Sequence, residues 1–344
     1  MKKRASSANR GVGKMHGLLM AAGLLAGSAV TAVTIDVVSV GNTQNSNDDT
    51  GYGAVDYEYQ IGKYEVTAGQ YVEFLNAVAD EEDTYGLYDG NMDDQSWGCQ
   101  ITRSGSSGSY TYDFSGAPEG DAEDWEDRPV NYVSWGDAAR FANWMHNGQP
   151  SGAQNDNTTE DGAYDMDGKT SNADLVTISR ELDAIWAIPT ENEWYKAAYH
   201  KNDGDTGNYF TYPTSSDSPP SNDLGDPDPG NNATFNDSTY TVGYPYYRTN
   251  AGDHENSESP YGTFDQGGNL TEWNESIQYG SWRGFRGGGY ADTATSLAAD
   301  TRGGQLPSGD YYIGFRLVRL VIPEPNSAAL LVAAGALALR RRRL

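Results

Sequence analysis

Thiol and imidazole side chains, which carry much of the covalent and metal chemistry of enzymes, are scarce in this chain. Between residues 33 and 320 it holds one cysteine, Cys99, and three histidines, His146, His200 and His254. No two of them are close in sequence, so no metal-ligand spacing is recognisable. The histidines are therefore interpreted as exposed or loop residues. The sequence also has neither a Gly-x-Ser-x-Gly elbow nor a glycine-rich phosphate loop.

Carboxylates are the abundant chemical group. Nine of the 23 Lys and Arg and one of the 49 Asp and Glu lie in the two end segments, so residues 33–320 hold 14 bases and 48 acids, a net charge of −34. Such a surface repels nucleic acid and anionic lipid, which excludes nucleic-acid binding, and it suits divalent cations, a salty exterior or a basic partner. Solubility alone is an alternative explanation.

One acidic segment has part of a calcium-loop pattern. Asp165-Met166-Asp167-Gly168 resembles the middle of an EF-hand loop, but Ala163 stands at the first ligand position and Asp174 replaces the expected Glu. We therefore predict a solvated loop here.

The N-terminal segment has the three parts of an export signal. Residues 1–15 are basic, Leu18 to Val33 is an apolar run, and Val30-Thr31-Ala32 offers small residues for cleavage. We predict that residues 1–32 direct export. A membrane anchor is the alternative, although the run is short for a span.

The C-terminal segment, residues 321–344, resembles a bacterial PEP-CTERM sorting tail. Pro323-Glu324-Pro325 is followed by an apolar run from Ala328 to Leu339 and by four arginines. The run can sit in a bilayer with the arginines on the cytoplasmic side. We expect transient membrane anchoring, removal by a sorting protease, and a final place at the bacterial cell surface, envelope or extracellular matrix. An ordinary tail anchor is the alternative.

Three helices are predicted, each from an N-cap residue followed by an amphipathic pattern. They begin after Thr67, Ser134 and Thr190, and the last two have an acid at the reciprocal capping position, Asp137 and Glu193. Their apolar stripes are Tyr71, Phe74, Leu75 and Val78; Ala138, Phe141, Ala142 and Met145; and Trp194, Ala197 and Ala198. This spacing favours core packing over a binding surface.

The remaining sequence predicts many loops and few strands. Polar segments at 80–127, 147–175 and 201–232 are predicted to be loops. Strands are predicted at Tyr57–Tyr64, Phe285–Gly289 and Ile313–Leu320. The chain has 24 Tyr and 8 Trp, which favours a loop-rich fold with aromatic anchors.

Six short motifs follow one another between residues 64 and 319. They are Tyr64-Glu65-Val66-Thr67, Arg128-Pro129-Val130-Asn131-Tyr132-Val133-Ser134-Trp135, Ile188-Pro189-Thr190-Glu191-Asn192-Glu193-Trp194, Gly268-Asn269-Leu270-Thr271-Glu272-Trp273, Arg286-Gly287-Gly288-Gly289-Tyr290 and Gly314-Phe315-Arg316. Together they resemble the formylglycine-generating enzyme (sulfatase-modifying factor) family. The resemblance implies an α+β fold for residues 33–320, the C-type-lectin-like variant of that family, with little regular secondary structure.

The resemblance also implies a site that this chain does not complete. Catalytic members of the family bind copper through two cysteines after the Arg-Gly-Gly motif, and those positions fall on Asp292 and Leu297 here. Leucine cannot ligate copper, and one carboxylate is a poor Cu(I) ligand, so no catalytic residue is predicted. Relatives that hold non-haem iron take histidines from an extra domain that this chain lacks. Copper and iron are therefore not expected.

Calcium is the metal that the resemblance favours, because the family holds structural calcium in two loops. Hard oxygen ligands and a glycine-rich acidic turn suit this ion. The implied ligands are Asp265 with the carbonyls of Gln266, Gly268 and Leu270 at one site, and Asn232, Ala233 and Asp237 at the other. Ordinary Asx turns are the alternative at both sites.

Three functional hypotheses follow. The first is an exported cell-surface protein whose domain lacks the oxidase chemistry and acts as a calcium-stabilised binding module for an exported protein or surface polymer. The second is a metal-dependent oxidoreductase of the formylglycine-generating type, with a site near Asp292 and Arg302 that acts on protein or small thiols. The third is a purely structural surface protein. Arg286, Arg302 and Arg316 are predicted to be scaffold arginines paired with acids.

Overall fold

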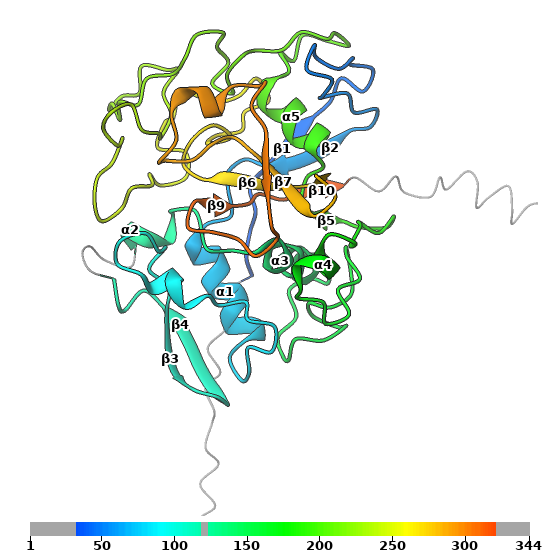
Figure 1. Cartoon of the computed structure of the whole chain (residues 1–344), viewed down its shortest axis with the longest axis vertical. Helices are drawn as coiled ribbons and strands as arrows, with labels where there is room; N and C mark the ends of the chain where they lie inside the picture. The colour runs from blue at the N-terminus through cyan, green and yellow to red at the C-terminus, as the bar shows by residue number, and fades with distance from the viewer. Residues whose placement is uncertain (1–31, 118–122, 321–344) are drawn as a thin grey trace, which may run out of the picture. The chain divides into compact units, whose positions relative to one another are not determined.

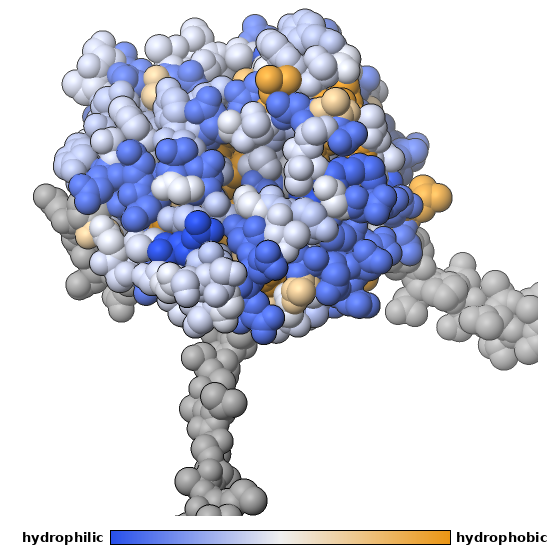
Figure 2. All heavy atoms as spheres, turned by 60° about the horizontal axis from the view of Figure 1, so that its bottom comes forward, coloured by the Kyte–Doolittle hydropathy of each residue, from blue (hydrophilic) through white to orange (hydrophobic). Residues whose placement is uncertain are grey.

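The computed structural model of the chain describes residues 32–117 and 123–320, and the predicted export and sorting segments lie almost wholly outside them (Figure 1). Within the described ranges, no helix is both long and apolar enough to cross a membrane. Figure 2 shows a face that is mostly hydrophilic, with only scattered hydrophobic residues, in keeping with the acidic composition.

Two four-stranded sheets form the frame of the fold. The first has the order β1 (Val37–Val40), β2 (Tyr59–Gly62), β10 (Val318–Leu320) and β5 (Trp186–Ala187), and all its pairs are antiparallel. The second has the order β8 (Gly303–Gln305), β7 (Trp282–Arg286), β6 (Thr271–Gln278) and β9 (Ile313–Gly314), with β6 and β9 parallel. A separate hairpin joins β3 (Thr102–Ser106) and β4 (Ser109–Asp113).

The helices are short and lie on both sides of the central strands. In Figure 1, α1 (Ala68–Val78), α3 (Trp135–His146) and α4 (Asn172–Leu175) lie below β6 and β7, and α5 (Glu191–Tyr199) lies above with the long loops. The single turn α2 (Glu123–Glu126) and the 3₁₀ turns η1 (Gly90–Asp93) and η2 (Ala294–Leu297) complete the elements.

The three predicted helices are present, and each begins after the predicted N-cap residue. Thr67, Ser134 and Thr190 are the N-caps of α1, α3 and α5, and each side chain accepts a hydrogen bond from the backbone three residues on. The reciprocal bond closes a capping box in every case. The polar caps therefore fixed these boundaries locally.

The predicted strand over Ile313–Leu320 is wrong as a single element. The chain leaves one sheet after Gly314 and enters the other at Val318, so β9 and β10 belong to different sheets. A Cβ at Gly314 would lie 2.8 Å from the Val130 carbonyl oxygen, so only glycine fits this close approach. The crossing turns Arg316 into the interior.

Two other boundaries also differ from the sequence predictions. The strand predicted at Phe285–Gly289 is β7, which ends at Arg286 because Gly287 and Gly288 take positive φ values of 98° and 65°. The predicted loop at 80–127 contains the β3–β4 hairpin, closed by a two-residue turn with Gly108 at φ 92°. Residues 102–113 therefore form a hairpin and not a loop.

An aromatic cluster between α1 and α3 forms the centre of the core. The Phe141 ring lies 5.2–6.1 Å, centroid to centroid, from the rings of Tyr71, Phe74, Trp144 and Phe315. All five side chains are fully buried. Edge-to-face and stacked pairs of this kind add packing energy to the burial of apolar surface, so the predicted stripes are confirmed as core.

Replacing Phe141 with Ala should lower the free energy of unfolding by about 3–5 kcal/mol, because four ring contacts would be lost around a cavity. Urea unfolding followed by fluorescence would measure the change. Tyr279→Ala serves as the control, since Tyr279 is 84% exposed, and it should shift stability by less than about 0.5 kcal/mol. Equal effects of the two substitutions would contradict this account of the core.

Candidate functional site

A buried ion pair lies at the centre of the candidate metal site. Arg316 donates from Nε to Glu272 Oε2 at 2.7 Å and from Nη2 to Glu272 Oε1 at 2.6 Å. The guanidinium also donates to the carbonyls of Gly62 at 3.0 Å and Phe264 at 2.8 Å. Trp194 Nε1 donates to Glu272 Oε2 at 2.8 Å. This bidentate pair joins β6, the end of β2, α5 and the segment before β10 at one point.

Two further carboxylates approach this pair. Glu65 Oε1 accepts a hydrogen bond from the Leu270 backbone at 3.0 Å, whereas Glu65 Oε2 is buried and has no hydrogen-bond partner among the described residues. Asp265 Oδ2 accepts from the Gly252 backbone at 2.7 Å. Glu65 belongs to the first sequence motif, but the sequence did not identify it as a site residue.

The electrostatics of the group are unbalanced, because three carboxylates face one guanidinium. Burial raises the pKa of Glu65 well above its usual range, and the charges of Glu272 and Asp265 add to the effect. Burial also raises the pKa of Asp265 to about 6. Full ionisation would leave two uncompensated negative charges in a buried place, which is costly without a counter-ion. A divalent cation would supply the missing charge.

The donor set fits calcium better than a redox metal. Glu65 and Asp265 offer hard carboxylate oxygens, and the glycine-rich turn that follows can offer carbonyls, as calcium prefers. Among the described residues, no three His, Cys, Asp or Glu side chains are placed to hold a metal by themselves. Coordination would therefore need backbone oxygens or water in addition to these two carboxylates.

The structure gives the other predicted ligands of this turn different environments. Gln266 uses its side chain internally, since Nε2 donates to the Trp194 carbonyl at 3.0 Å. Gly268 has a φ of 90° and donates its N–H to the Gly287 carbonyl at 3.1 Å. Leu270 presents its N–H to Glu65. The turn thus brings Asp265 and Leu270 to Glu65, and a metal role for the three carbonyls remains a prediction.

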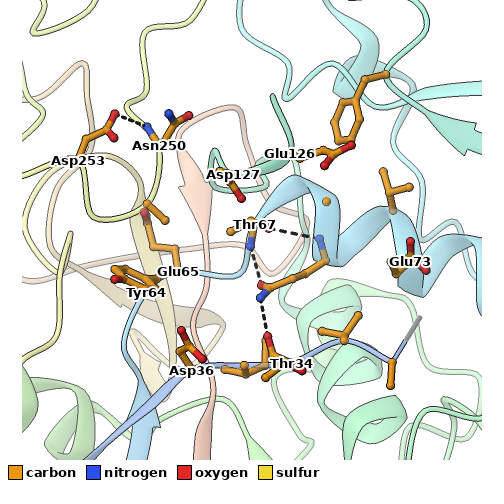
Figure 3. A pocket seen from close by; sticks show the side chains of 18 residues that line it. Thr34, Asp36, Tyr64, Glu65, Thr67, Glu73, Glu126, Asp127, Asn250 and Asp253 are labelled. Atoms are coloured by element: carbon orange, nitrogen blue, oxygen red, sulfur yellow. Dashed lines mark hydrogen bonds between the residues drawn. The ribbon is translucent and has the colours of Figure 1, made fainter. Parts of the chain in front are cut away.

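A pocket of the surface gives access to Glu65. The pocket has a volume of about 770 Å³ and is lined by Glu65, Asn250 and further acids, which are Asp36, Glu73, Glu126, Asp127 and Asp253. In Figure 3, Glu65 lies on the same side of this pocket as Asn250 and Asp253, opposite Glu73. Asn250 Oδ1 is a second buried oxygen without a hydrogen-bond partner among the described residues. An acid-lined entrance leading to unsatisfied oxygens suits the approach of a cation.

The second predicted calcium loop has a different arrangement. Asn232 is buried and donates from Nδ2 to Asp228, whereas Asp237 is exposed. Burial alone would raise the pKa of Asp228, but hydrogen bonds from Gly230, Ser257 and Asn232 lower it. The Ala233 N–H donates to the Ser221 carbonyl at 3.0 Å. The amide of Asn232 therefore holds a buried Asp228 that the sequence did not single out, and the site itself remains a prediction.

Asp292 and Leu297, to which the resemblance assigns the copper positions, have unlike surroundings. Leu297 is fully buried among apolar neighbours that include Phe235. Asp292 accepts from the Gly289 N–H at 2.9 Å and lines a pocket of about 340 Å³ with Arg286 and Arg302. The pocket exists, but among the described residues none that lines it is Cys or His.

The scaffold role predicted for the arginines of this pocket is confirmed. Glu191 Oε1 accepts from Arg286 Nε at 2.8 Å and from Arg302 Nε at 2.9 Å, and Glu191 Oε2 accepts from Arg302 Nη2 at 2.6 Å. Two guanidinium groups share the Glu191 carboxylate, and Asp292 supplies a second carboxylate in the same pocket, so the four charges balance. Arg302 stays about one-third exposed there.

The thiol and imidazole groups do not converge. Cys99 is fully buried, and burial raises the pKa of its thiol, which makes it unreactive. His200 and His254 are buried as well. The prediction that they are exposed is therefore wrong. Burial lowers the pKa of both rings, and they bond to Tyr261 at 2.8 Å and Thr234 at 3.0 Å.

Lowering the pH should stabilise the calcium-free protein through Asp265. Its folded pKa, about 6, lies above an unfolded value of about 3.9, so the folded state binds the extra proton between these values. Stability is then lost as the pH rises through about 6, by roughly 1–3 kcal/mol. Urea unfolding in a chelator at pH 4.5 and pH 7 would measure this. Asp265→Asn should reduce this change in the free energy of unfolding between the two pH values. The same change in the variant and in the wild type would contradict the assignment to Asp265.

Comparisons with known proteins agree on one domain. A sequence profile of the Sulfatase-modifying factor enzyme 1-like domain matches residues 31–321. Among curated proteins, no sequence matches the chain.

Solved structures give the fold independently. The Treponema denticola variable protein 1 is similar with a TM-score of 0.50 and 18% identity, covering 85% of this chain and 97% of that one. CarF (TM-score 0.48, 21% identity, 84% and 99% covered) and PvdO from Pseudomonas aeruginosa (TM-score 0.40, 15% identity, 84% and 93% covered) are also similar. The expected α+β, loop-rich, C-type-lectin-like fold is confirmed, and the chain belongs to the sulfatase-modifying factor family.

Proposed function

We propose that this chain is an exported bacterial surface protein whose sulfatase-modifying-factor domain is a calcium-stabilised binding module and not a formylglycine-generating oxidase. The observation that carries the proposal is the buried group around Arg316, where three carboxylates face one guanidinium and Glu65 Oε2 lacks a partner among the described residues. Export by residues 1–32 and sorting by residues 321–344 rest on the sequence patterns.

Oxidase chemistry is disfavoured by the ligands that this chain offers. Cu(I) is selected and held by soft sulfur, but the single thiol, Cys99, is buried and the copper positions are Asp292 and Leu297. The alternative of an iron-dependent oxidoreductase has no support in this pocket, because no described residue lining it is a histidine. Conversion of a Cys-x-Pro-x-Arg peptide to formylglycine by the purified protein would overturn the proposal.

The pocket beside Arg302 is the proposed place of binding. It is concave, about 340 Å³ in volume, and combines the aromatic walls of Phe285, Tyr311 and Tyr312 with Asp292 and Arg302. Apolar walls with a few polar groups are the usual composition of a ligand pocket. The calcium centre would hold β6, α5 and the loop at Asp265 in place behind it. The partner is an exported protein or a surface polymer.

Calcium should raise the melting temperature, whereas the Asp265 carboxylate should lower it when calcium is absent. In a chelator at pH 7.5, Asp265→Asn should melt at or above the wild-type temperature, because one repelling charge is gone. In millimolar calcium, the wild type should melt roughly 5 °C or more higher than in chelator, whereas the variant should gain much less. Differential scanning calorimetry would measure all four values.

Two further variants make this test specific. Glu65→Gln should gain as little from calcium as Asp265→Asn, since it removes the carboxylate whose unpartnered oxygen would ligate the ion. Asp183→Asn removes one charge from an exposed acid elsewhere and should respond to calcium as the wild type does. An identical calcium response in all four proteins, or none in any, would contradict the proposed centre.

A further inference from the structure

Partly exposed aromatic rings continue from the proposed binding pocket across three loops. We call this set the aromatic ladder; it comprises Tyr312, Tyr311, Trp97, Tyr247 and Tyr244. Successive ring centroids lie 5.2, 5.7, 4.6 and 6.5 Å apart. Tyr244 is 57% exposed, and the other four are partly exposed. Tyr311 and Tyr312 also line the pocket, so ladder and pocket form one continuous surface.

The ladder is held rigidly from beneath. Tyr290 is fully buried and stacks under Trp97 and Tyr247, with interplanar angles of 20° and 29°. The Trp97 carbonyl accepts from Asn131 Nδ2 at 2.7 Å and from Arg248 Nη1 at 2.9 Å. A surface whose rings are already fixed loses little conformational entropy when it binds a ligand.

The backbone at Tyr247 sets the position of its ring. Its φ is 54°, in the left-handed region that a bulky residue rarely adopts. This conformation places the ring 4.6 Å from that of Trp97.

We propose, on the basis of the binding-module function above, that the aromatic ladder and its pocket bind a neutral polysaccharide. The ring surfaces that the Trp97–Tyr247 stack does not cover are apolar and uncharged, which suits the C–H faces of sugar rings. The net charge of −34 over residues 33–320 repels polyanions. A row of rings leading into a pocket fits a chain with repeated flat units and not a single small molecule.

The polar groups of the pocket distinguish a sugar from a proline-rich peptide. Asp292 and Arg302 both line the pocket; Arg302 donates from Nε and Nη2 to Glu191, so its Nη1 is the group left to donate, and Asp292 Oδ1 is left to accept. Sugar hydroxyls both donate and accept, so they can satisfy both residues. Proline residues have no N–H to donate, and a polyproline segment would therefore leave the Asp292 carboxylate facing carbonyl oxygens.

Affinity electrophoresis in native gels tests the proposal with the exported, full-length protein in calcium. The gels contain one soluble neutral polysaccharide each: hydroxyethylcellulose, xylan, galactomannan or a β-glucan. We expect at least one to retard the wild type, and we expect Tyr244→Ala and Trp97→Ala to weaken that binding by about ten-fold or more. Trp97→Phe should restore most of it, because it keeps a ring.

The control is Tyr110→Ala, which removes a partly exposed ring that packs against Arg103 on the β3–β4 hairpin and is not part of the ladder. Tyr244 is exposed, so Tyr244→Ala reports on binding even if Trp97→Ala unfolds. No retardation by any neutral polysaccharide, equal weakening by Tyr110→Ala, or binding of a polyproline peptide instead would overturn the inference. If calcium-dependent melting persists in that case, the proposed calcium-stabilised module still stands.

Discussion

The buried pair of Arg316 and Glu272, with two more carboxylates against it, is the constraint on which the rest of the structure depends. Much of the described chain lies outside helices and strands. Its loops must therefore be held by side-chain contacts, because regular backbone hydrogen bonds do not hold them. Arg316 supplies one by bonding Glu272 and the carbonyls of Gly62 and Phe264 together. When all three are ionised, Glu272, Glu65 and Asp265 carry more negative charge than one arginine can balance, which supports the calcium centre that we propose.

The charges at the second pocket are balanced. There two arginines share Glu191, and the Asp292 carboxylate lines the same pocket. The fold thus separates an acid-rich centre, suited to a metal ion, from an arginine-bearing pocket with aromatic walls, suited to an organic ligand. Under the proposed function, calcium would stabilise the acid-rich centre and the pocket would bind the organic ligand, and neither role would need a thiol.

The sequence predicted those features of the fold that depend on residues close to each other in the chain. Thr67, Ser134 and Thr190 marked helix starts, because an N-cap acts on its own next turn. The sequence did not reveal the role of Glu65, because its charged neighbours Glu272 and Arg316 lie more than 200 residues away in the chain. The split of Ile313–Leu320 into two strands has the same origin, since the crossing is set by contacts between distant segments.

Elemental analysis of the protein, purified without added metal, tests the central claim most directly. The account predicts about one calcium ion or more per chain, with copper and iron far below one per chain. Copper or iron at one per chain, with no calcium, would contradict it, because the ion would then be held by a redox centre instead of the carboxylates around Arg316.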